Sequence, residues 1–286
     1  MIQLGLTGWP LAHSRSPQIH TLALKLAGLE GEYRLYPTDP ASPNSLLALL
    51  SQVRSGQILG LNVTIPHKET VIPHLDKLSD NAIAIGAVNT ILLRDGLLFG
   101  DNTDAPGFTA DLLNNGLDIH YSPGEAIIFG AGGSARAVFH SLLIAGWQIH
   151  VFVRNVEKSR QAISDFHGKG YPGGIKMYSY HELGAILRSA KIDLIVDTTP
   201  LGMNPNVDGC AWPSGLKMPQ SALLYDLVYN PNETTIMQLA RSQGLRASNG
   251  WGMLVEQALL AFEIWTGRHI ERAWFSAAFE QMNTQP

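Results

Sequence analysis

Short apolar runs alternate with amphipathic stretches along most of the chain. Residues 2–6 have the composition of a strand, and residues 45–53 show the apolar spacing that is typical of an amphipathic helix. Ser16 and Pro17 indicate a helix start, because serine caps a first turn and proline fits its first position. In the first part of the chain we expect strands at 2–6, 33–36, 59–65, 88–93 and 97–99, helices at 16–28 and 45–53, and a hairpin turn at 94–96.

The second part of the chain begins after Asp104 and contains apolar runs of a different kind. Residues 126–129 are continuously apolar, as in a strand buried on both faces of a parallel sheet. Helical segments separate the further strands expected here, and strand–helix–strand order predicts a doubly wound parallel sheet of the Rossmann type. The further expected elements are strands at 149–153, 194–196 and 223–225, a helix that follows the glycine-rich segment 130–135 and runs to about 146, and a final helix at 253–265. The sequence therefore predicts an α/β protein with an N-terminal α/β domain at 1–104, joined by a C-terminal helix at about 251–286, and a nucleotide domain at 105–250.

Composition narrows the class of protein. Apolar residues make up 45% and charged residues 15% of the 286 positions, which is typical of a compact folded chain. The net charge of −4 supplies no basic field for nucleic acid or for an anionic membrane. Cys210 is the only cysteine, so no internal disulfide can form and a reducing cytoplasm is expected. We find no metal-ligand spacing, no signal peptide and no membrane-spanning run, and we expect no metal and no membrane contact.

The most informative polar residue is Lys68, which follows the run Asn-Val-Thr-Ile-Pro-His at 62–67. Val63 and Ile65 are expected to point into a core, and Pro66 ends the strand because it lacks an N–H. A lysine held in this way can act as a proton donor or base, because burial and neighbouring charges shift its pKa readily. The competing interpretation is a solvated lysine that begins a surface helix.

A glycine-rich turn follows the strand at 126–129. Gly130, Gly132 and Ala135 fit the pattern G-x-G-x-x-G/A between a strand and a helix, which favours a dinucleotide whose pyrophosphate lies at the helix N-terminus. A tight turn without a ligand would also use glycine. After the next strand stand Arg154 and Asn155, where NAD enzymes usually carry an acidic residue. A guanidinium can bind a 2′-phosphate, so the cofactor is expected to be NADP rather than NAD, although an ordinary exposed arginine would look the same.

Other polar residues are weaker candidates. Ser14 and Ser16 lie at the mouth of a helix, where hydroxyls and N–H groups can bind a carboxylate, or where one serine simply caps the helix. The segment 100–104 joins the two parts of the chain, where ligands often bind, but it could be a solvated linker. Asn89 could be no more than a turn residue.

Together these motifs resemble the shikimate dehydrogenase family over nearly the whole chain. The motifs that carry the resemblance are 8–10 with 13–17, then 62–68, 85–90, 102–104, 130–133, 199–203, 226–229 and 253–258. The resemblance implies a substrate-binding first domain, a cytoplasmic oxidoreductase of aromatic amino-acid biosynthesis, and reduction of 3-dehydroshikimate to shikimate with NADPH. It also implies a small-molecule substrate, no nucleic-acid partner, and a monomer or homodimer.

The resemblance assigns roles to individual residues. Lys68 and Asp104 are expected to be the catalytic residues. The expected substrate-binding residues are Ser14, Ser16, Thr64, Asn89, Tyr229 and Gln257. The expected cofactor-binding residues are Asp80, Gly130, Ala131, Gly132, Gly133, Ser134, Arg154, Asn155, Leu227 and Gly250. We expect Lys68 to stabilise and protonate the ketone oxygen while Asp104 keeps it charged, both residues standing in rigid, non-helical motifs.

One departure from the family pattern concerns the cofactor. The family commonly shows Asn-Arg-Thr after the second strand of the nucleotide domain, whereas this chain has Arg154, Asn155 and Val156. The shifted arginine leaves a quinate or dual quinate/shikimate dehydrogenase that uses NAD as an alternative. A catalytically silent, cofactor-sensing binding protein on the same scaffold is an alternative of another class, against which the presence of both Lys68 and Asp104 argues.

Overall fold

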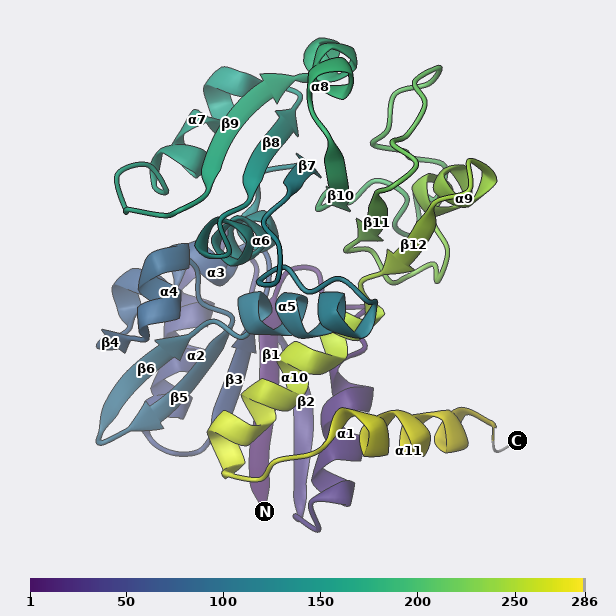
Figure 1. Cartoon of the computed structure of the whole chain (residues 1–286). Coiled ribbons are helices and arrows are strands. Elements are labelled where there is room, and N and C mark those ends of the chain that lie inside the picture. The colour runs from purple at the N-terminus through teal and green to yellow at the C-terminus, as the bar shows by residue number, and fades with distance from the viewer. Residues whose placement is uncertain (285–286) are drawn as a thin grey trace. The chain divides into compact units, whose positions relative to one another are not determined.

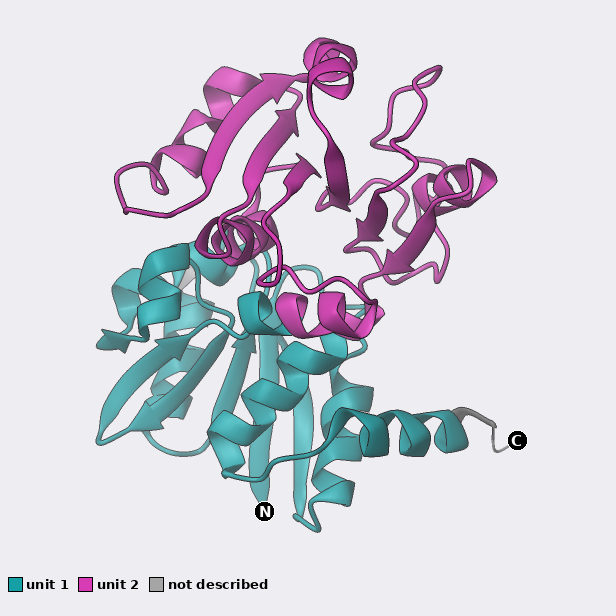
Figure 2. Ribbon diagram, in the orientation of Figure 1, with its two compact units in different colours: residues 1–107, 254–286 teal, residues 108–253 magenta. Residues whose placement is uncertain are grey.

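The computed structural model describes residues 1–284, and the chain divides into two compact units. Unit 1 contains Met1–Gly107 and the chain from Leu254 onward, and unit 2 contains Phe108–Met253 (Figure 2). Figure 1 shows helices and strands in both units, as expected for an α/β protein. Among residues 1–284, no helix has the length and apolar character needed to cross a membrane.

Unit 1 is built on a mixed six-stranded sheet in the order β2-β1-β3-β5-β6-β4. Its strands are β1 (Ile2–Gly8), β2 (Gly31–Pro37), β3 (Gly60–Val63), β4 (Lys77–Leu78), β5 (Thr90–Arg94) and β6 (Leu97–Asp101). Its helices are α1 (Ser16–Leu26), α2 (Pro43–Arg54), α3 (His67–Thr70), the 3₁₀ turn η1 (Ile72–His74), α4 (Asp80–Ile85) and α11 (Arg272–Thr284), with α5 (Asp104–Asn114) and α10 (Trp251–Thr266) shared between the units. The predicted hairpin is confirmed: β5 and β6 pair antiparallel around Asp95 and Gly96, both of which have positive φ.

Helices cover the unit 1 sheet because its strands are apolar. Leu49 and Val53 of α2 belong to one apolar cluster with Leu61, Ile91 and Leu98 of the sheet. A second close contact involves Gly60 of β3, where a Cβ atom would overlap the ring of Trp265 in α10. Glycine is therefore required there, and its absent side chain lets α10 lie directly against the sheet.

The strand before Lys68 is shorter than the sequence indicates. It ends at Val63, which is buried, whereas Ile65 is 55% exposed, so the expectation that Ile65 points into the core is wrong. The Ile65–Pro66 peptide bond is cis, and the chain turns at this point instead of continuing as a strand. Pro66 does end the extended segment, as predicted.

Unit 2 is an all-parallel six-stranded sheet in the order β12-β11-β10-β7-β8-β9, which is the predicted Rossmann arrangement. Its strands are β7 (Glu125–Phe129), β8 (Gln148–Val153), β9 (Gly174–Ser179), β10 (Ile192–Asp197), β11 (Leu223–Asp226) and β12 (Arg246–Asn249). Its helices are α6 (Gly133–Ile144), α7 (Val156–Ser164), the 3₁₀ turn η2 (Tyr180–Glu182), α8 (Leu183–Ser189) and α9 (Thr235–Ser242).

The two faces of this sheet belong to different apolar clusters. Ile128 packs on the side of α6, whereas Ile127 packs on the side of α8 and α9, as residues that alternate along a strand must. Both are completely buried, which explains why 126–129 is a continuous apolar run. The order of strands brings the carboxyl ends of β7 and β10 together, where ligands of such sheets bind.

Candidate active site

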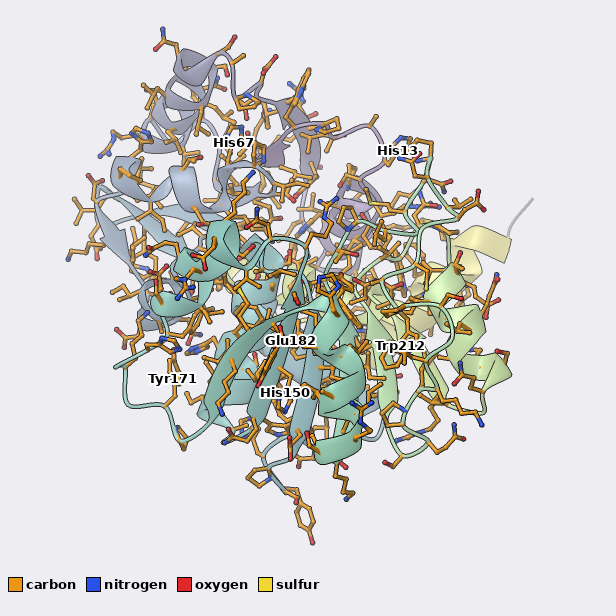
Figure 3. The ribbon with its side chains drawn as sticks, turned by 90° about the horizontal axis from the view of Figure 1, so that it is seen from above. His13, His67, His150, Tyr171, Glu182 and Trp212 are labelled. Atoms are coloured by element: carbon orange, nitrogen blue, oxygen red, sulfur yellow. The ribbon has the colours of Figure 1, made fainter. Side chains whose placement is uncertain are left out.

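Lys68 lies in α3, a single helical turn held by the sheet of unit 1. Val88 N–H donates to the Lys68 carbonyl at 2.7 Å. The neighbouring His67 is buried, and its Nε2 donates to the Thr38 carbonyl at 2.7 Å (labelled in Figure 3). The expectation of a non-helical motif is therefore wrong for Lys68, because the turn at Pro66 starts a short helix. The hydrogen bonds of the Lys68 carbonyl and of the His67 side chain still fix the position of the lysine backbone.

Asp104 is likewise helical, since it is the first residue of α5. Asn102 stabilises the first turn of α5. Its Oδ1 accepts the N–H of Asp104 at 3.0 Å, and its Nδ2 donates to the Ala87 carbonyl at 2.9 Å. The segment 100–104 is thus no solvated linker, because its first two residues end β6 and its last begins α5. Asn102, Thr103 and Asp104 are all buried.

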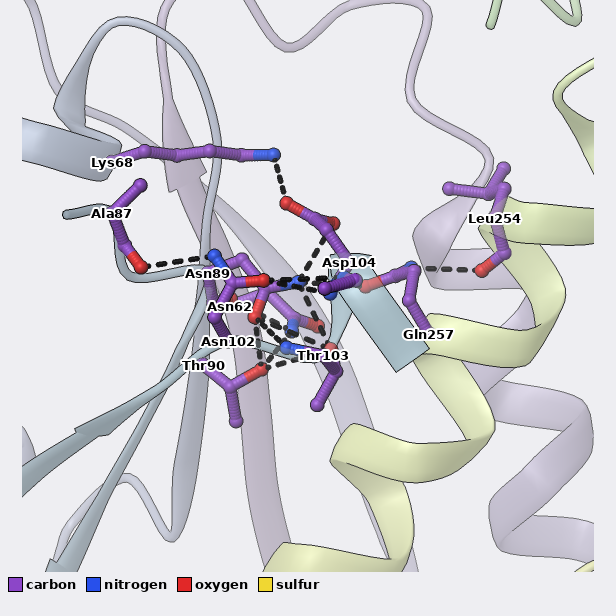
Figure 4. A network of polar contacts seen from close by, with 11 residues as sticks. Asn62, Lys68, Ala87, Asn89, Thr90, Asn102, Thr103, Asp104, Leu254 and Gln257 are labelled. Atoms are coloured by element: carbon purple, nitrogen blue, oxygen red, sulfur yellow. Dashed lines mark hydrogen bonds and ion pairs between the residues drawn. The ribbon is translucent and has the colours of Figure 1, made fainter. Parts of the chain in front are cut away.

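Lys68 and Asp104 meet as a buried ion pair. Lys68 Nζ lies 2.6 Å from Asp104 Oδ2, with the two side chains 10% and 7% exposed (Figure 4). Removing charges from water is costly, so a buried pair adds little net stability compared with apolar side chains of similar size. An ion pair kept at such a place, beside other polar groups, indicates chemistry rather than packing. The alternative of a solvated lysine is excluded.

Asn89 completes the site around this pair. Its Nδ2 donates to Asp104 Oδ1 at 2.8 Å, to Thr103 Oγ1 at 2.9 Å and to Gln257 Oε1 at 3.3 Å (Figure 4). Its Oδ1 accepts the N–H of Thr103 at 2.8 Å. Gln257 is held in turn, because its Nε2 donates to the Leu254 carbonyl at 2.8 Å. The structure therefore brings four of the predicted residues together, and Asn89 is no mere turn residue.

The other predicted residues of unit 1 lie on neighbouring segments. Ser16 is the first residue of α1 rather than its cap: the N-cap position is Arg15, and Ser14 Oγ accepts the Ser16 N–H at 3.3 Å. Thr64 follows β3, where its N–H donates to the Thr7 carbonyl at 2.9 Å. Asp80 begins α4 and is exposed, while the preceding Ser79 caps that helix.

The glycine turn of unit 2 has the geometry of a phosphate site. Gly130 has φ +96°, and a Cβ there would lie 2.6 Å from Thr198 Oγ1, so this position needs glycine for backbone and packing reasons. At Gly132, by contrast, a Cβ would meet no described atom within 4 Å. Gly132 is also the N-cap of α6, and no side chain of the described residues caps that helix. An open, uncapped helix N-terminus fits the pyrophosphate of a dinucleotide.

The ends of β8 and β11 carry the remaining predicted cofactor residues. Asn155 caps α7 by accepting the Lys158 N–H at 2.9 Å, whereas the Arg154 side chain is exposed. Gly250 approaches the β11 loop so closely that a Cβ would overlap the Leu227 carbonyl oxygen, and the rings of Tyr229 and Trp251 lie 6.5 Å apart. Leu227, Tyr229 and Gly250 therefore cluster within unit 2, and Arg154 remains a candidate for a 2′-phosphate.

Sequence reasoning missed several residues of the unit 1 network. Asn62, Thr90 and Thr103 are buried and bonded to Asn89 or to one another. Each stands inside or beside a motif singled out for another residue, but nothing in the motif shows that its own side chain belongs to the network. Their adjacency depends on the pairing of β3 with β5, which joins Asn62 to Thr90 and cannot be seen in a single sequence.

Comparisons with known proteins give a consistent result. Residues 6–91 match the family described as "Shikimate dehydrogenase substrate binding domain", and residues 250–273 match "Shikimate 5'-dehydrogenase C-terminal domain". A shikimate dehydrogenase (NADP(+)) of Carboxydothermus hydrogenoformans is 39% identical over 264 residues, which cover 92% of this chain and 91% of the relative.

Solved structures agree in fold. Shikimate 5-dehydrogenase from Thermus thermophilus, in complex with NADP(H) and shikimate, has a TM-score of 0.84 and 34% identity over 98% of this chain and 99% of that one. Shikimate 5-dehydrogenase from Listeria monocytogenes, in complex with shikimate and NAD, has a TM-score of 0.87 and 28% identity over 99% and 96% of the two chains.

Proposed function

Because this chain belongs to the shikimate dehydrogenase family, we propose that it reduces 3-dehydroshikimate to shikimate with NADPH, in the route to chorismate and the aromatic amino acids. The observation that carries the proposal is the buried Lys68–Asp104 pair, bonded through Asp104 to Asn89 and through Asn89 to Gln257. These groups offer an ammonium donor, a carboxylate acceptor and two amides, which suit a polyhydroxylated ketone.

We assign the substrate groups as follows. Ser14 and Ser16, at the start of α1, bind the carboxylate, since hydroxyls beside a helix N-terminus favour an anion. Thr64, Asn89, Gln257 and Tyr229 contact hydroxyls or the ring. Unit 1 would then be the substrate-binding domain and unit 2 the cofactor domain. The single cysteine supports a reducing compartment such as the cytoplasm.

The residues of the site carry out the proton chemistry of the reaction. When bound, NADPH supplies the hydride that the ketone carbon accepts. Negative charge then develops on the ketone oxygen, where the Lys68 ammonium stabilises it and gives up one proton, which solvent later restores. Asp104 holds the Lys68 ammonium in place through Oδ2, and its second oxygen accepts a hydrogen bond from Asn89.

We assign the cofactor contacts to the following residues. The turn Gly130, Ala131, Gly132, Gly133 and Ser134 holds the pyrophosphate against the N-terminus of α6. Arg154, with Asn155, binds the 2′-phosphate through its guanidinium. Asp80, Leu227 and Gly250 line the nicotinamide side.

Replacing Lys68 by Ala tests the proposal directly. We expect kcat for 3-dehydroshikimate reduction to fall by about 10²- to 10⁴-fold, the usual contribution of a positioned acid, with a much smaller change in KM. Lys25→Ala, at an exposed lysine in the last turn of α1, is the matched control and should retain wild-type kinetics. An unchanged kcat for Lys68→Ala contradicts the assignment.

A quinate/shikimate dehydrogenase that uses NAD is the second candidate, since the Listeria relative was solved with shikimate and NAD. Steady-state kinetics with 3-dehydroshikimate and 3-dehydroquinate, each with NADPH and NADH, separate the two enzymes. A silent cofactor-sensing protein would instead bind NADPH tightly and reduce neither ketone.

A further inference from the structure

A chain of buried hydrogen bonds lies behind the Lys68–Asp104 pair in unit 1. Tyr33 hydroxyl donates to Asn62 Oδ1 at 2.8 Å. Asn62 Nδ2 donates to the Asn89 carbonyl at 3.1 Å and to Thr90 Oγ1 at 3.3 Å. Thr90 Oγ1 then donates to Asn89 Oδ1 at 2.9 Å. Tyr33 is 7% exposed, and the other three residues are 5% exposed or less.

The direction of each bond in this chain follows from its neighbours. Because the Asn89 carbonyl can only accept, Asn62 must present its NH₂ group there and its Oδ1 to Tyr33. Thr90 accepts from that NH₂ group, and its single proton goes to Asn89 Oδ1 at 2.9 Å, which is the nearer acceptor because Thr103 Oγ1 lies 3.4 Å away. With Oδ1 accepting both from Thr90 and from the Thr103 N–H at 2.8 Å, Asn89 must present its NH₂ group to Asp104.

We propose that Thr90 is a positioning residue for the reduction, and that Tyr33 and Asn62 act through it to hold the Asn89 amide against Asp104. The reverse orientation of Asn89 would place its oxygen against the Asp104 carboxylate and its NH₂ against the Thr90 and Thr103 donors. Thr90 therefore lowers the population of molecules in which the Asn89 amide is reversed. In those molecules Asp104 would lose its bond from Asn89, and Lys68 would be held less well. The effect on turnover rests on the proposed function, whereas the orientation of Asn89 does not.

Thr90→Val, Thr90→Ser and Thr7→Val form a matched set. Valine keeps the shape of threonine without its hydroxyl, and serine restores the hydroxyl. Thr7 is the control, because it is completely buried in the same sheet but its Oγ1 pairs with Thr38 Oγ1 at 2.7 Å. For Thr90→Val we expect kcat to fall about tenfold with KM changed less, the size of one lost buried hydrogen bond. Thr90→Ser and Thr7→Val should stay close to wild type.

Hydrogen exchange of the Asn89 side-chain amide gives a readout that needs no turnover. Selective ¹⁵N-asparagine labelling, with Asn89→Asp to identify the signal, should show exchange about tenfold faster in Thr90→Val than in wild type or Thr90→Ser. If wild type fails to reduce 3-dehydroshikimate, the proposed function is wrong but this amide still tests the role of Thr90. Equal exchange and equal kcat in Thr90→Val and Thr90→Ser would overturn the proposal.

Tyr33→Phe provides a second variant should Thr90→Val fold poorly. It keeps the ring that stacks on His20, with centroids 4.3 Å apart, and removes the hydroxyl, which donates to Asn62 and also interacts with the Ser16 side chain. We expect a smaller loss of kcat in the same direction. The double variant should be no slower than Thr90→Val alone, because both changes act through Asn89. Losses that multiply in the double variant would show that Tyr33 acts elsewhere.

Discussion

His20 is a buried histidine of unit 1 whose pKa is set mainly by burial, with a smaller opposing effect of the Asn62 side chain. It is completely buried on α1 and stacks on Tyr33, and within residues 1–284 neither ring nitrogen has a partner. Burial lowers its pKa from 6.5 to about 3, so the folded protein holds it neutral. Between these two values the unfolded chain binds a proton that the folded chain does not, and stability is therefore lost as the pH falls below about 6.5.

His20→Phe should remove this acid sensitivity. Between pH 7 and pH 5 the free energy of unfolding of wild type should fall by about 2 kcal/mol more than that of the variant, at about 1.4 kcal/mol per pH unit. Urea unfolding at both pH values measures it. His74→Phe, at an exposed histidine, should follow wild type. Parallel losses in wild type and His20→Phe would mean that His20 is not the group responsible.

Residue types and motif spacing predicted the residues at the centre of the buried network but not those that support them. Lys68 and Asp104 could be found because their charges stand out in motifs that resemble a family. Thr90 and Asn62 could not, since a buried polar residue is recognised by its partners, and these lie on another strand. Ile65 was misplaced because an alternating pattern does not show where the strand ends.

At the scale of elements, the register of β10 and β11 places two carboxylates side by side. Asp197 pairs with Asp226 at the ends of these strands, and both are completely buried. Thr199 N–H bonds to Asp197 Oδ1, but Asp197 Oδ2 has no partner within the described chain. Burial, and then the Asp226 charge, raise the pKa of Asp197 to about 7, and burial raises the pKa of Asp226 to about 6.

Asp197→Asn should stabilise the protein in alkali. The folded state keeps a proton on Asp197 that the unfolded state releases near pH 3.8, so stability is lost as the pH rises through about 7. Relative to wild type, the variant should gain on the order of 4 kcal/mol of unfolding free energy between pH 4 and pH 9, at about 1.4 kcal/mol per pKa unit. Urea unfolding at the two pH values decides this, with the exposed Asp208→Asn as control. No gain at pH 9 contradicts the prediction.

In the turn between β7 and α6, one substitution can change cofactor binding without changing stability. Gly132→Ala should leave stability unchanged, because its φ of −83° suits alanine and no described atom lies within 4 Å of the new Cβ. The same Cβ would occupy the space of the pyrophosphate, so the KM for NADPH should rise about tenfold or more. Kinetics and thermal unfolding measure both effects.

Two other glycine variants serve as comparisons for Gly132→Ala. Gly184→Ala, in α8 and with only ordinary contacts around its Cβ, should leave the KM for NADPH unchanged and raise stability by at most about 1 kcal/mol, because alanine favours the helix. Gly130→Ala should lower stability as well, because its φ is +96° and its Cβ would meet Thr198. Unchanged NADPH kinetics in Gly132→Ala would place the cofactor elsewhere.

At the scale of the whole molecule, the α/β class, the Rossmann sheet and the hairpin could be predicted. Strands β9 and β12 were missed, and they are the two edges of the unit 2 sheet. Edge strands need no continuous apolar run, and Arg-Ala-Ser-Asn at 246–249 shows none. The mixed order of the unit 1 sheet also escaped prediction, because pairing between distant strands leaves no local signal.

The proposed preference for NADPH over NADH depends on one exposed side chain, Arg154. Arg154→Asp should raise the KM for NADPH about tenfold to hundredfold and leave that for NADH nearly unchanged, since only NADPH carries the 2′-phosphate. Arg188→Asp, on α8, controls for the change in net charge. Equal effects on both cofactors would assign the 2′-phosphate to other residues.

The bond between Asn89 and Gln257 joins residues 168 positions apart, with all of unit 2 between them in the chain. A ribosome that adds 5–20 residues per second needs roughly 10 to 30 s to cover that separation. For most of this interval the nascent chain already contains Lys68, Asn89 and Asp104 but lacks Gln257, whose side-chain amide accepts a hydrogen bond from Asn89. Lys68, Asn89 and Asp104 are therefore made early, and their hydrogen-bond network is completed only after all of unit 2 has been translated.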